Sequence, residues 1–321
     1  MFNRHIQLSI FPILFLPIWG CAASSRSFTF EYEIEIHDLP ATARSVDIWL
    51  PVPEESPCQH VHAFKTTSPV EGHILRENAY GDRIWHARIP VGDASSLRII
   101  QQVEIVRREC SAQQTTAADH ELDGPQPNRF LEPNHLVPAA PRFARMAREL
   151  TEGRTQATDR ARALYDHVLR SMRYDKTGTG WGRGDADFAC DVGRGNCTDF
   201  HSLFIALCRA AGIPARFRIG FPLPSDRGSG SVGGYHCWAE FWTDKAGWTP
   251  VDISEAWKHP DLRDYFFGNI DENRIAYSMG RDLRLSPPQQ GPPINFFIYP
   301  HVEVDGQPWD RVNRQFRYKN L

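Results

Sequence analysis

The sequence predicts an α+β protein with two domains: an antiparallel β-sandwich, followed by a domain in which one buried helix packs on an antiparallel sheet. Three observations support this. Segments of alternating hydrophobic and polar residues dominate the first third of the chain, helical spacing occupies the middle, and alternating segments return near residue 216. The 321 residues are ample for more than one domain, and 41% hydrophobic and 23% charged residues are ordinary for a soluble protein. A formal charge of −3 without a basic run argues against a nucleic-acid partner.

Residues 1–21 have the pattern of a signal peptide, so they are excluded from the fold. The hydrophobic run from Ile6 to Leu16 is too short for a typical membrane span. The next residues, Ile18 to Cys21 (IWGC), resemble a bacterial lipoprotein processing site, in which a lipidated Cys21 would become the mature N-terminus and anchor the protein to a membrane. Trp19 is larger than the residue usual there, so ordinary secretion is the alternative. Both interpretations predict an exported protein of the periplasm or cell envelope.

Residues 26–125 are predicted to form the β-sandwich. Hydrophobic residues stand at every second position from Phe28 to Ile36, as in a strand with one buried face. Strands at this spacing, separated by turn signals and without a helical period, indicate an antiparallel sandwich. No chemically distinctive group stands out, so we expect a scaffold. The further strand candidates are Val46–Pro53, His60–Thr66, Arg83–Ile89 and Leu97–Val106.

Residues 130–321 are predicted to form the second domain, which opens with helices over Phe143–Leu150 and Ala157–Met172. The Gly-rich stretch from Tyr174 to Asp191 is then expected to be irregular. Because it precedes Cys197 directly, it is a candidate wall of a cleft. Trp181 could cover a thiol there or help an oxyanion site, although a Trp that packs a loop is the commoner case.

Two arginines of the same region, Arg183 and Arg194, could bind an anionic group of a substrate. Solvated loop arginines are the ordinary alternative.

A third helix begins at Cys197, within the stretch from Gly193 to Leu207 (GRGNCTDFHSLFIAL). Its apolar residues have the spacing of a buried helix face. Asn196 or Thr198 can cap this helix, and Asp199 suits its positive end. The same end of the helix lowers the pKa of a thiol, so Cys197 is a candidate nucleophile, and its backbone N–H is a candidate oxyanion donor. The plain alternative is a core cysteine.

Two strands of a predicted hairpin carry the candidate partners of Cys197. His236 begins the strand Tyr235–Trp242, and Asp252 ends the strand Trp248–Asp252. In an antiparallel hairpin these ends are neighbours, so the carboxylate can orient the imidazole toward the thiol. Cys, His and Asp at element ends thus predict a thiolate–imidazolium nucleophile with an orienting carboxylate. A last strand over Phe296–Val304 is expected to join the sheet of this domain.

If the protein is exported, its other cysteines can form disulfides. Cys58 and Cys110 both lie in the sandwich and are a plausible disulfide. Cys190 lies in the cleft loop and Cys208 has the spacing of a core residue. Cys237 should point away from the face of His236, because neighbouring strand residues alternate. A zinc site of Cys190, Cys197 and His236 is conceivable, but no Cys-x-x-Cys spacing supports it.

These motifs, GNCTDFHSLFIALCRAAGIPARF, GGYHCWAEFW and GWTPVDISEA, resemble those of transglutaminase-like proteins, a bacterial branch of the papain-type thiol enzymes. The likeness is strong over about Arg162–Ala256. In that superfamily the nucleophile, base and orienting residue come in the order Cys, His, Asp, which implies Cys197, His236 and Asp252. Its members include cross-linking enzymes, amidases and peptidases, which share attack of a thiolate on a carboxamide.

The expected function is therefore acyl transfer from a peptide or protein carboxamide through a thioester, with no metal or cofactor. Water would give hydrolysis, which we favour because water is the abundant nucleophile, and an amine would give cross-linking. The rival hypothesis is a non-catalytic binding module of the cell envelope that keeps the fold. An intact Cys, His and Asp set counts against it. A zinc hydrolase is a more distant alternative.

Overall fold

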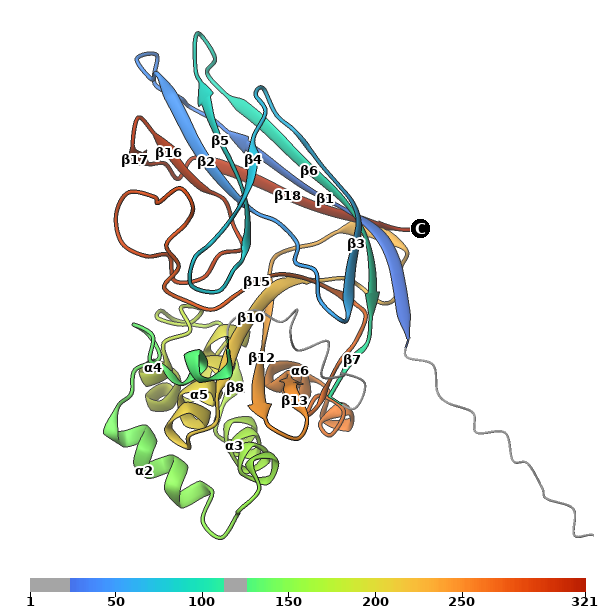
Figure 1. Ribbon diagram of the computed structural model, residues 1–321, viewed down its shortest axis with the longest axis vertical. Coiled ribbons are helices and arrows are strands. Elements are labelled where there is room, and N and C mark those ends of the chain that lie inside the picture. Colours follow the sequence, from blue (N-terminus) through green and yellow to red (C-terminus); the bar gives the residue numbers. More distant parts are fainter. Residues whose placement is uncertain (1–23, 113–125) are drawn as a thin grey trace, which may run out of the picture.

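The computed structural model describes residues 24–112 and 126–321 (Figure 1). The segment 1–21, with Cys21, lies outside the described residues. The upper part of the molecule in Figure 1 is a sandwich of two five-stranded antiparallel sheets, with strand orders β11-β18-β1-β6-β3 and β17-β16-β2-β5-β4. Among the helices that are described, none is long and apolar enough to cross a membrane.

Alternation of residues explains the sandwich core. In β1 (Ser25–Ile36) and β6 (Leu97–Arg108), alternate side chains are buried. Phe30 pairs with Val103 in the register of these two strands, and both face the core. The opposite sheet contributes β2 (Ser45–Pro51) and β5 (Arg83–Pro90). The predicted strands of this region all form. The edge strands of the two sheets are β3 (Gln59–Thr67) and β4 (His73–Arg76), and β4 was not predicted.

The C-terminal strands return to the sandwich. β16 (His301–Val304) pairs with β2, and β18 (Val312–Asn320) pairs with β1 and with the short β11 (Ser229–Ser231). The prediction that the last strand joins the sheet of the second domain is wrong, and the range 130–321 is too long for that domain. The physical reason is that β16 pairs with β2 and buries Val302 and Val304 in the sandwich core. Strand β18 likewise covers the edge of β1 and adds buried aromatic side chains. A short strand, β17 (Gln307–Pro308), completes this region.

The lower part of Figure 1 contains a four-stranded antiparallel sheet with helices against it. The central helix α5 (Cys197–Ala210) packs on β12 and β10 and is buried from Cys197 to Cys208. This is the predicted α+β arrangement of a buried helix on an antiparallel sheet. The strands, in sheet order, are β13 (Gly247–Val251), β12 (His236–Thr243), β10 (Ala215–Pro222) and β15 (Arg274–Met279). The helices that contact α5 are α2 (Pro141–Leu150), α3 (Ala157–Ser171), α4 (Ala186–Val192) and α6 (Ile253–Lys258).

Helix α4 corrects the prediction of an irregular stretch up to Asp191. Asp185 caps this helix, with its Oδ1 accepting from the backbone N–H groups of Asp187 (3.1 Å) and Phe188 (3.2 Å). Gly193 ends it in the left-handed conformation, at φ 65°. The glycines of the stretch all lie before Asp185, so the residues after it were free to form a helix. The remaining short elements are η1 (Pro127–Leu131), η2 (Pro260–Leu262), the parallel pair β8 (Arg173–Tyr174) and β9 (Arg194–Gly195), and the pair β7 (Cys110–Ser111) and β14 (Asn269–Ile270).

The two parts of the molecule share a hydrophobic core. The ring of Phe221 in β10 lies 5.2 Å from Phe30 of β1 and 4.4 Å from Phe316 of β18. Nearby, Cys58 and Cys110 form the predicted disulfide, next to the point where β7 pairs with β14. The sandwich is therefore packed directly onto the sheet that carries the candidate site.

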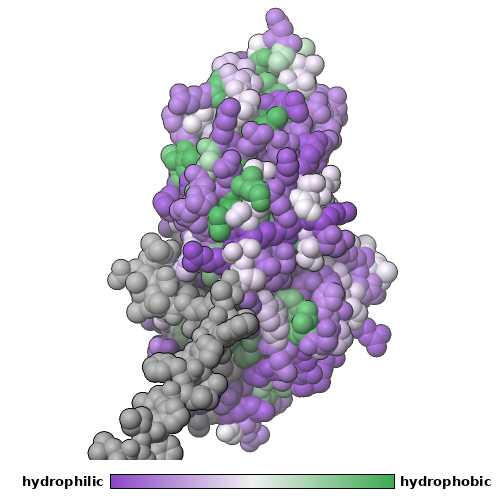
Figure 2. Space-filling view, turned by 90° about the vertical axis from the view of Figure 1, so that its right-hand side faces the viewer, coloured by the Kyte–Doolittle hydropathy of each residue, from purple (hydrophilic) through white to green (hydrophobic). Residues whose placement is uncertain are grey.

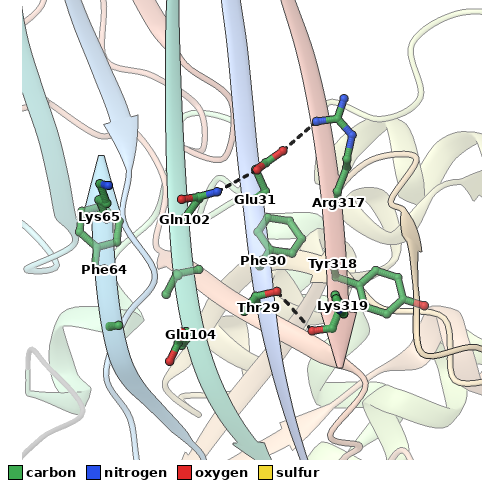
Figure 3. Close-up of a pocket in the computed structure, with 12 residues that line it drawn as sticks. Thr29, Phe30, Glu31, Phe64, Lys65, Gln102, Glu104, Arg317, Tyr318 and Lys319 are labelled. Carbon is green, nitrogen blue, oxygen red and sulfur yellow. Dashed lines mark hydrogen bonds and ion pairs between the residues drawn. The ribbon is translucent and has the colours of Figure 1, made fainter. Parts of the chain in front are cut away.

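The surface of the sandwich is mostly hydrophilic (Figure 2). On the outer face of the first sheet, a depression of about 510 Å³ is lined by residues of β1, β3, β6 and β18 (Figure 3). There Glu31 accepts hydrogen bonds from Gln102 (3.0 Å) and Arg317 (2.8 Å). Cross-strand polar pairs of this kind are typical of a solvated sheet face.

Candidate active site

The N-terminus of α5 places Cys197 at the junction of the helix and the sheet. Asn196 caps the helix: its Oδ1 accepts from the backbone N–H of Thr198 (2.9 Å), and Asp199 Oδ2 accepts from the backbone N–H of Asn196 (2.9 Å). Of the two predicted caps, Asn196 is the one used. Cys197 is only 2% exposed, so its thiol lies at the positive end of a buried helix.

His236 and Asp252 meet as the hairpin predicts. His236 Nε2 lies 2.6 Å from Asp252 Oδ2. His236 is the first residue of β12, and Asp252 follows β13 and caps α6 with a hydrogen bond from the backbone N–H of Glu255 (3.0 Å). Asp252 is fully buried. The structure therefore brings the carboxylate and the imidazole into direct contact.

The charges of the site favour a thiolate and an imidazolium. Burial opposes ionisation of Cys197, but hydrogen bonds from Cys237 and His236, together with the charge of His236, hold the pKa of this thiol well below its ordinary value. Burial likewise opposes protonation of His236, yet Asp252 and the Cys197 sulfur raise the pKa of the imidazole to about 10. The pKa of Asp252 stays well below its ordinary range, against its burial, because of the charge and hydrogen bond of His236 and the charge of Arg274. A proton shared by this group therefore resides on His236 at neutral pH.

Arg274 is a component of the site that was not predicted. Its Nη1 donates to Asp252 Oδ2 (2.7 Å) and its Nη2 donates to Asp271 Oδ2 (3.0 Å). Arg274 is 4% exposed, at the start of β15. A charged residue that opens an apolar strand was the available signal. The Oδ2 atom of Asp252 thus accepts from both a histidine and an arginine.

His201 and Cys237 form a second layer beneath Cys197. The backbone N–H of Ile253 donates to His201 Nε2 (3.0 Å), so Nδ1 carries the proton of the neutral ring, and Nδ1 lies 3.7 Å from Cys237 Sγ. Burial lowers the pKa of His201, which keeps the ring neutral. His201 stands four residues after Cys197, one helical turn along the same face, a spacing that could have identified it.

Cys237 also lies near Cys197. Its Sγ lies 3.7 Å from His201 Nδ1, and hydrogen bonding by Cys237 and His236 helps to lower the pKa of the Cys197 thiol. That Cys237 points away from the face of His236 stays a prediction.

The Gly-rich loop before the thiol is held by Asp199 and Arg281. Asp199 Oδ2 accepts from the backbone N–H of Gly182 (2.7 Å), and Oδ1 accepts from that of Gly184 (3.0 Å). Arg281 Nη1 donates to the carbonyl of Gly184 (2.7 Å) and to Ser202 Oγ (2.6 Å). Gly184 has φ +64°, and a Cβ there would lie 2.7 Å from Ser202 Oγ, so a glycine is required. The loop is thereby fixed against the start of α5.

Trp181, Arg183 and Arg194 lie in or beside this loop. Trp181 Nε1 donates to the carbonyl of Gly178 (3.2 Å), and Arg194 Nη1 donates to Thr177 Oγ1 (3.3 Å). Both groups therefore bond within the loop itself. Arg183 is exposed, and its carbonyl accepts from Arg281 Nη2 (2.9 Å).

Two half-buried tyrosines lie next to the thiol. Tyr235 OH accepts from Asn196 Nδ2 (3.2 Å), and Lys258 Nζ lies 4.1 Å from the ring centre of Tyr174. Burial is the main cause that raises the pKa of both phenols, and the charge of Cys197 raises it further. These side chains flank the approach to a buried sulfur.

Over the described residues, no group of three or more His, Cys, Asp or Glu side chains has the geometry to hold a metal ion. Cys190 belongs to α4 rather than to the loop, and its Sγ lies 3.7 Å from Met146 Sδ. Cys208 is buried in the core, which raises the pKa of its thiol.

Comparisons with known proteins identify relatives of the chain. It is 26% identical over 348 residues to an uncharacterized protein of Haemophilus influenzae (strain ATCC 51907 / DSM 11121 / KW20 / Rd), which covers 94% of this chain and 92% of that protein. The fold is similar to the crystal structure of a candidate cysteine protease from Cytophaga hutchinsonii, with a TM-score of 0.58, 16% identity, and coverage of 93% of this chain and 99% of that one. The periplasmic domain of TgpA from Pseudomonas aeruginosa matches with a TM-score of 0.37 and 17% identity, over 76% of this chain and 91% of that one.

The Cytophaga structure shows that the α+β fold, sandwich included, occurs in another protein. Residues 144–253 match the model of the Transglutaminase-like superfamily. Cys197, His236 and Asp252 all lie in that range. Residues 144–253 are thus similar to the core of the Transglutaminase-like superfamily, and this range contains both the contact of His236 with Asp252 and the start of α5 at Cys197.

Proposed function

We propose that this protein is a cysteine-nucleophile amide hydrolase or acyltransferase. The observation that carries the proposal is the contact of His236 Nε2 with Asp252 Oδ2 (2.6 Å) beside Cys197, because the charge of His236 lowers the pKa of the Cys197 thiol. A buried thiolate at a helix start, paired with an oriented imidazolium, is the arrangement that nucleophilic cysteine catalysis requires. The transglutaminase-like core supports the same chemistry.

In the proposed reaction, the Cys197 thiolate attacks the carbonyl carbon of a peptide or protein carboxamide. A C–S bond forms, the C–N bond breaks, and His236 gives its proton to the leaving nitrogen, which leaves a thioester. Neutral His236 then takes a proton from water or an amine as that group attacks the thioester, and the thiolate is regenerated. Asp252 keeps the imidazole oriented throughout.

The backbone N–H of Cys197 is our candidate for the oxyanion donor, because it lies at the start of α5, where backbone donors face the group that the sulfur attacks. Trp181 stays a second candidate as part of the adjoining loop. We favour water as the acceptor of the acyl group, since nothing in the site marks a place for an amine.

We further propose that the protein is exported to the periplasm or cell envelope and anchored through a lipid on Cys21. Radiolabelled fatty acid should enter the wild-type protein and be absent from Cys21→Ser. Equal labelling of both would contradict lipidation at Cys21.

The proposal is tested by the pH dependence of iodoacetamide alkylation at Cys197, read by peptide mass. A free thiol with a pKa of about 8.5 gains about 80-fold in thiolate between pH 6 and pH 8. Cys197 should instead react at nearly the same rate at both values, because the charge of His236 holds the pKa of this thiol well below its ordinary value. The half-buried Cys190 in the same digest serves as an internal reference.

His236→Ala should remove the advantage of Cys197 at low pH, and Cys197→Ala should abolish turnover of amide substrates without a large change in Tm. If Cys197 titrates like a free thiol in the wild type, the catalytic proposal fails and the binding-module hypothesis replaces it.

A further inference from the structure

A second carboxylate lies beside the imidazole of His236. Glu255 Oε1 is 4.0 Å from His236 Nε2, the same nitrogen that lies 2.6 Å from Asp252 Oδ2. A separation of this size is too long for a hydrogen bond, but it is short for two opposite charges. The side chain of Glu255 is 20% exposed and that of His236 is 6% exposed, so solvent screens this pair only in part. The reaction proposed above gives Glu255 no role.

The backbone of α6 fixes where Glu255 stands. This residue belongs to the first turn of the helix, and its backbone N–H donates to Asp252 Oδ1 (3.0 Å). The carboxylate that orients the imidazole of His236 therefore also caps the turn that carries the second carboxylate. Both acidic side chains consequently reach the same nitrogen of the ring.

A lysine holds the side chain of Glu255 from another direction. Lys258 Nζ donates to Glu255 Oε1 (2.6 Å) and lies 4.1 Å from the ring centre of Tyr174. Tyr174 in turn pairs with Gly195 of β9, two residues before Cys197. The carboxylate of Glu255 is thus connected through printed neighbours of the thiol as well as through its own helix.

The cations around Glu255 reduce its charge without removing it from the imidazole. Oε1 serves both Lys258 Nζ and His236 Nε2, whereas His259 Nε2 lies 3.6 Å from Oε2 and is 54% exposed. A carboxylate near an imidazolium favours the protonated ring, and a nearby ammonium weakens that effect. We therefore expect a contribution that is smaller than the contribution of Asp252.

We propose that Glu255 is a second positioning residue for His236. Its charge stabilises the imidazolium, and a ring that turned out of its present orientation would move Nε2–H away from both carboxylates. Lys258 holds the Glu255 side chain on the Nε2 side of the ring. The inference rests on the catalytic role proposed for His236, but the effect of the charge on the imidazole can be measured without turnover.

Titration of the His236 imidazole by NMR tests the proposal in the full-length chain. A Cys197→Ala background removes the thiol that would titrate together with the ring, and loss of a signal in His236→Gln assigns it. In this background, Glu255→Gln should lower the pKa of His236 by about 0.5–1, because one of the two nearby carboxylates is lost. Glu255→Asp keeps the charge on a shorter side chain and should give a smaller decrease.

Glu132→Gln is the matched control, since Glu132 also forms an ion pair with a residue three positions away, Arg129. It follows η1, which lines a hollow together with Thr243, at the end of β12 opposite to His236. This substitution should leave the pKa of His236 unchanged. Unaltered signals from the histidines of the sandwich verify that each variant keeps its fold.

A pKa of His236 that is equal in Glu255→Gln and Glu132→Gln, or that rises in Glu255→Gln, would overturn the proposal. Either result would leave the catalytic proposal intact, because that proposal is tested separately by the alkylation of Cys197 in the protein that retains its thiol.

Discussion

Four donors surround the carboxylate of Asp252. His236 and Arg274 bond to Oδ2, while the Ser254 hydroxyl and the backbone N–H of Glu255 bond to Oδ1 at 3.0 Å each. Oδ2 is therefore shared between the imidazole that it orients and a guanidinium that competes for it. We infer that Arg274 is a positioning residue, which fixes the carboxylate and moderates the basicity of His236.

Replacements of Asp252 and of Arg274 should shift the pH dependence of Cys197 alkylation in opposite directions. Asp252→Asn removes a negative charge that stabilises the His236 imidazolium, so the pH above which alkylation is fast should rise, and turnover should fall by about 10²–10⁴-fold. Arg274→Gln removes a competing positive charge, so that pH should fall by about one unit, while turnover falls because the carboxylate is less fixed.

Arg274→Lys should restore part of the lost turnover. An unchanged pH profile in Arg274→Gln, or a shift in the same direction as that of Asp252→Asn, would show that the arginine has only a structural role.

At the residue scale, sequence patterns identified the partners of Cys197 that lie at the ends of strands. They missed the buried residues that lie behind these partners. His236 and Asp252 could be paired because a hairpin makes its two ends neighbours. Arg274 was not predicted, because β15 reaches the site only through its pairing with β10, and no local sequence pattern encodes that pairing.

At the scale of elements, the loop before Cys197 depends on one carboxylate. Asp199 accepts the backbone N–H groups of Gly182, Gly184 and Asn196. An asparagine would present its NH₂ group to at least one of these donors, so Asp199→Asn should destabilise the protein by about 1–3 kcal/mol. Urea unfolding measures this change.

Asp191→Asn is the control, because Asp191 is exposed and bonds only with Arg142 among the described residues. Its free energy of unfolding should stay within about 0.5 kcal/mol of the wild type. Equal effects of the two substitutions would mean that the loop is held by other contacts, such as those of Arg281.

Elements with strong local signals were predicted well, and those that depend on distant partners were not. The caps, spacing and alternation of α5, β12 and β13 are local, and all three form where expected. The final strands, in contrast, pair with strands from the start of the chain, β16 with β2 and β18 with β1, and no local pattern encodes these partners.

At the scale of the whole molecule, both ends of the described chain build one sandwich, which lies on one side of the domain that carries Cys197 (Figure 1). Truncation after Pro300 should therefore remove β16 and β18, uncover the core beside Phe30, and abolish cooperative thermal unfolding. Deletion of Leu321 alone, which is 71% exposed, should leave the Tm nearly unchanged. A soluble, cooperatively unfolding product of the longer truncation would show that the sandwich is stable without its last strands.

Strand β1 acquires its two neighbours at very different times during synthesis. Glu31 bonds with Gln102, 71 residues later, and with Arg317, 286 residues later. At ribosomal rates of 5–20 residues per second, the second edge of β1 stays open for roughly 15–60 s after the strand itself is made. During that interval the nascent chain exposes an unpaired edge beside Phe28, Phe30 and Tyr32, a template for wrong pairing between chains. Chaperone binding should therefore be needed longest at the segment that is translated among the first.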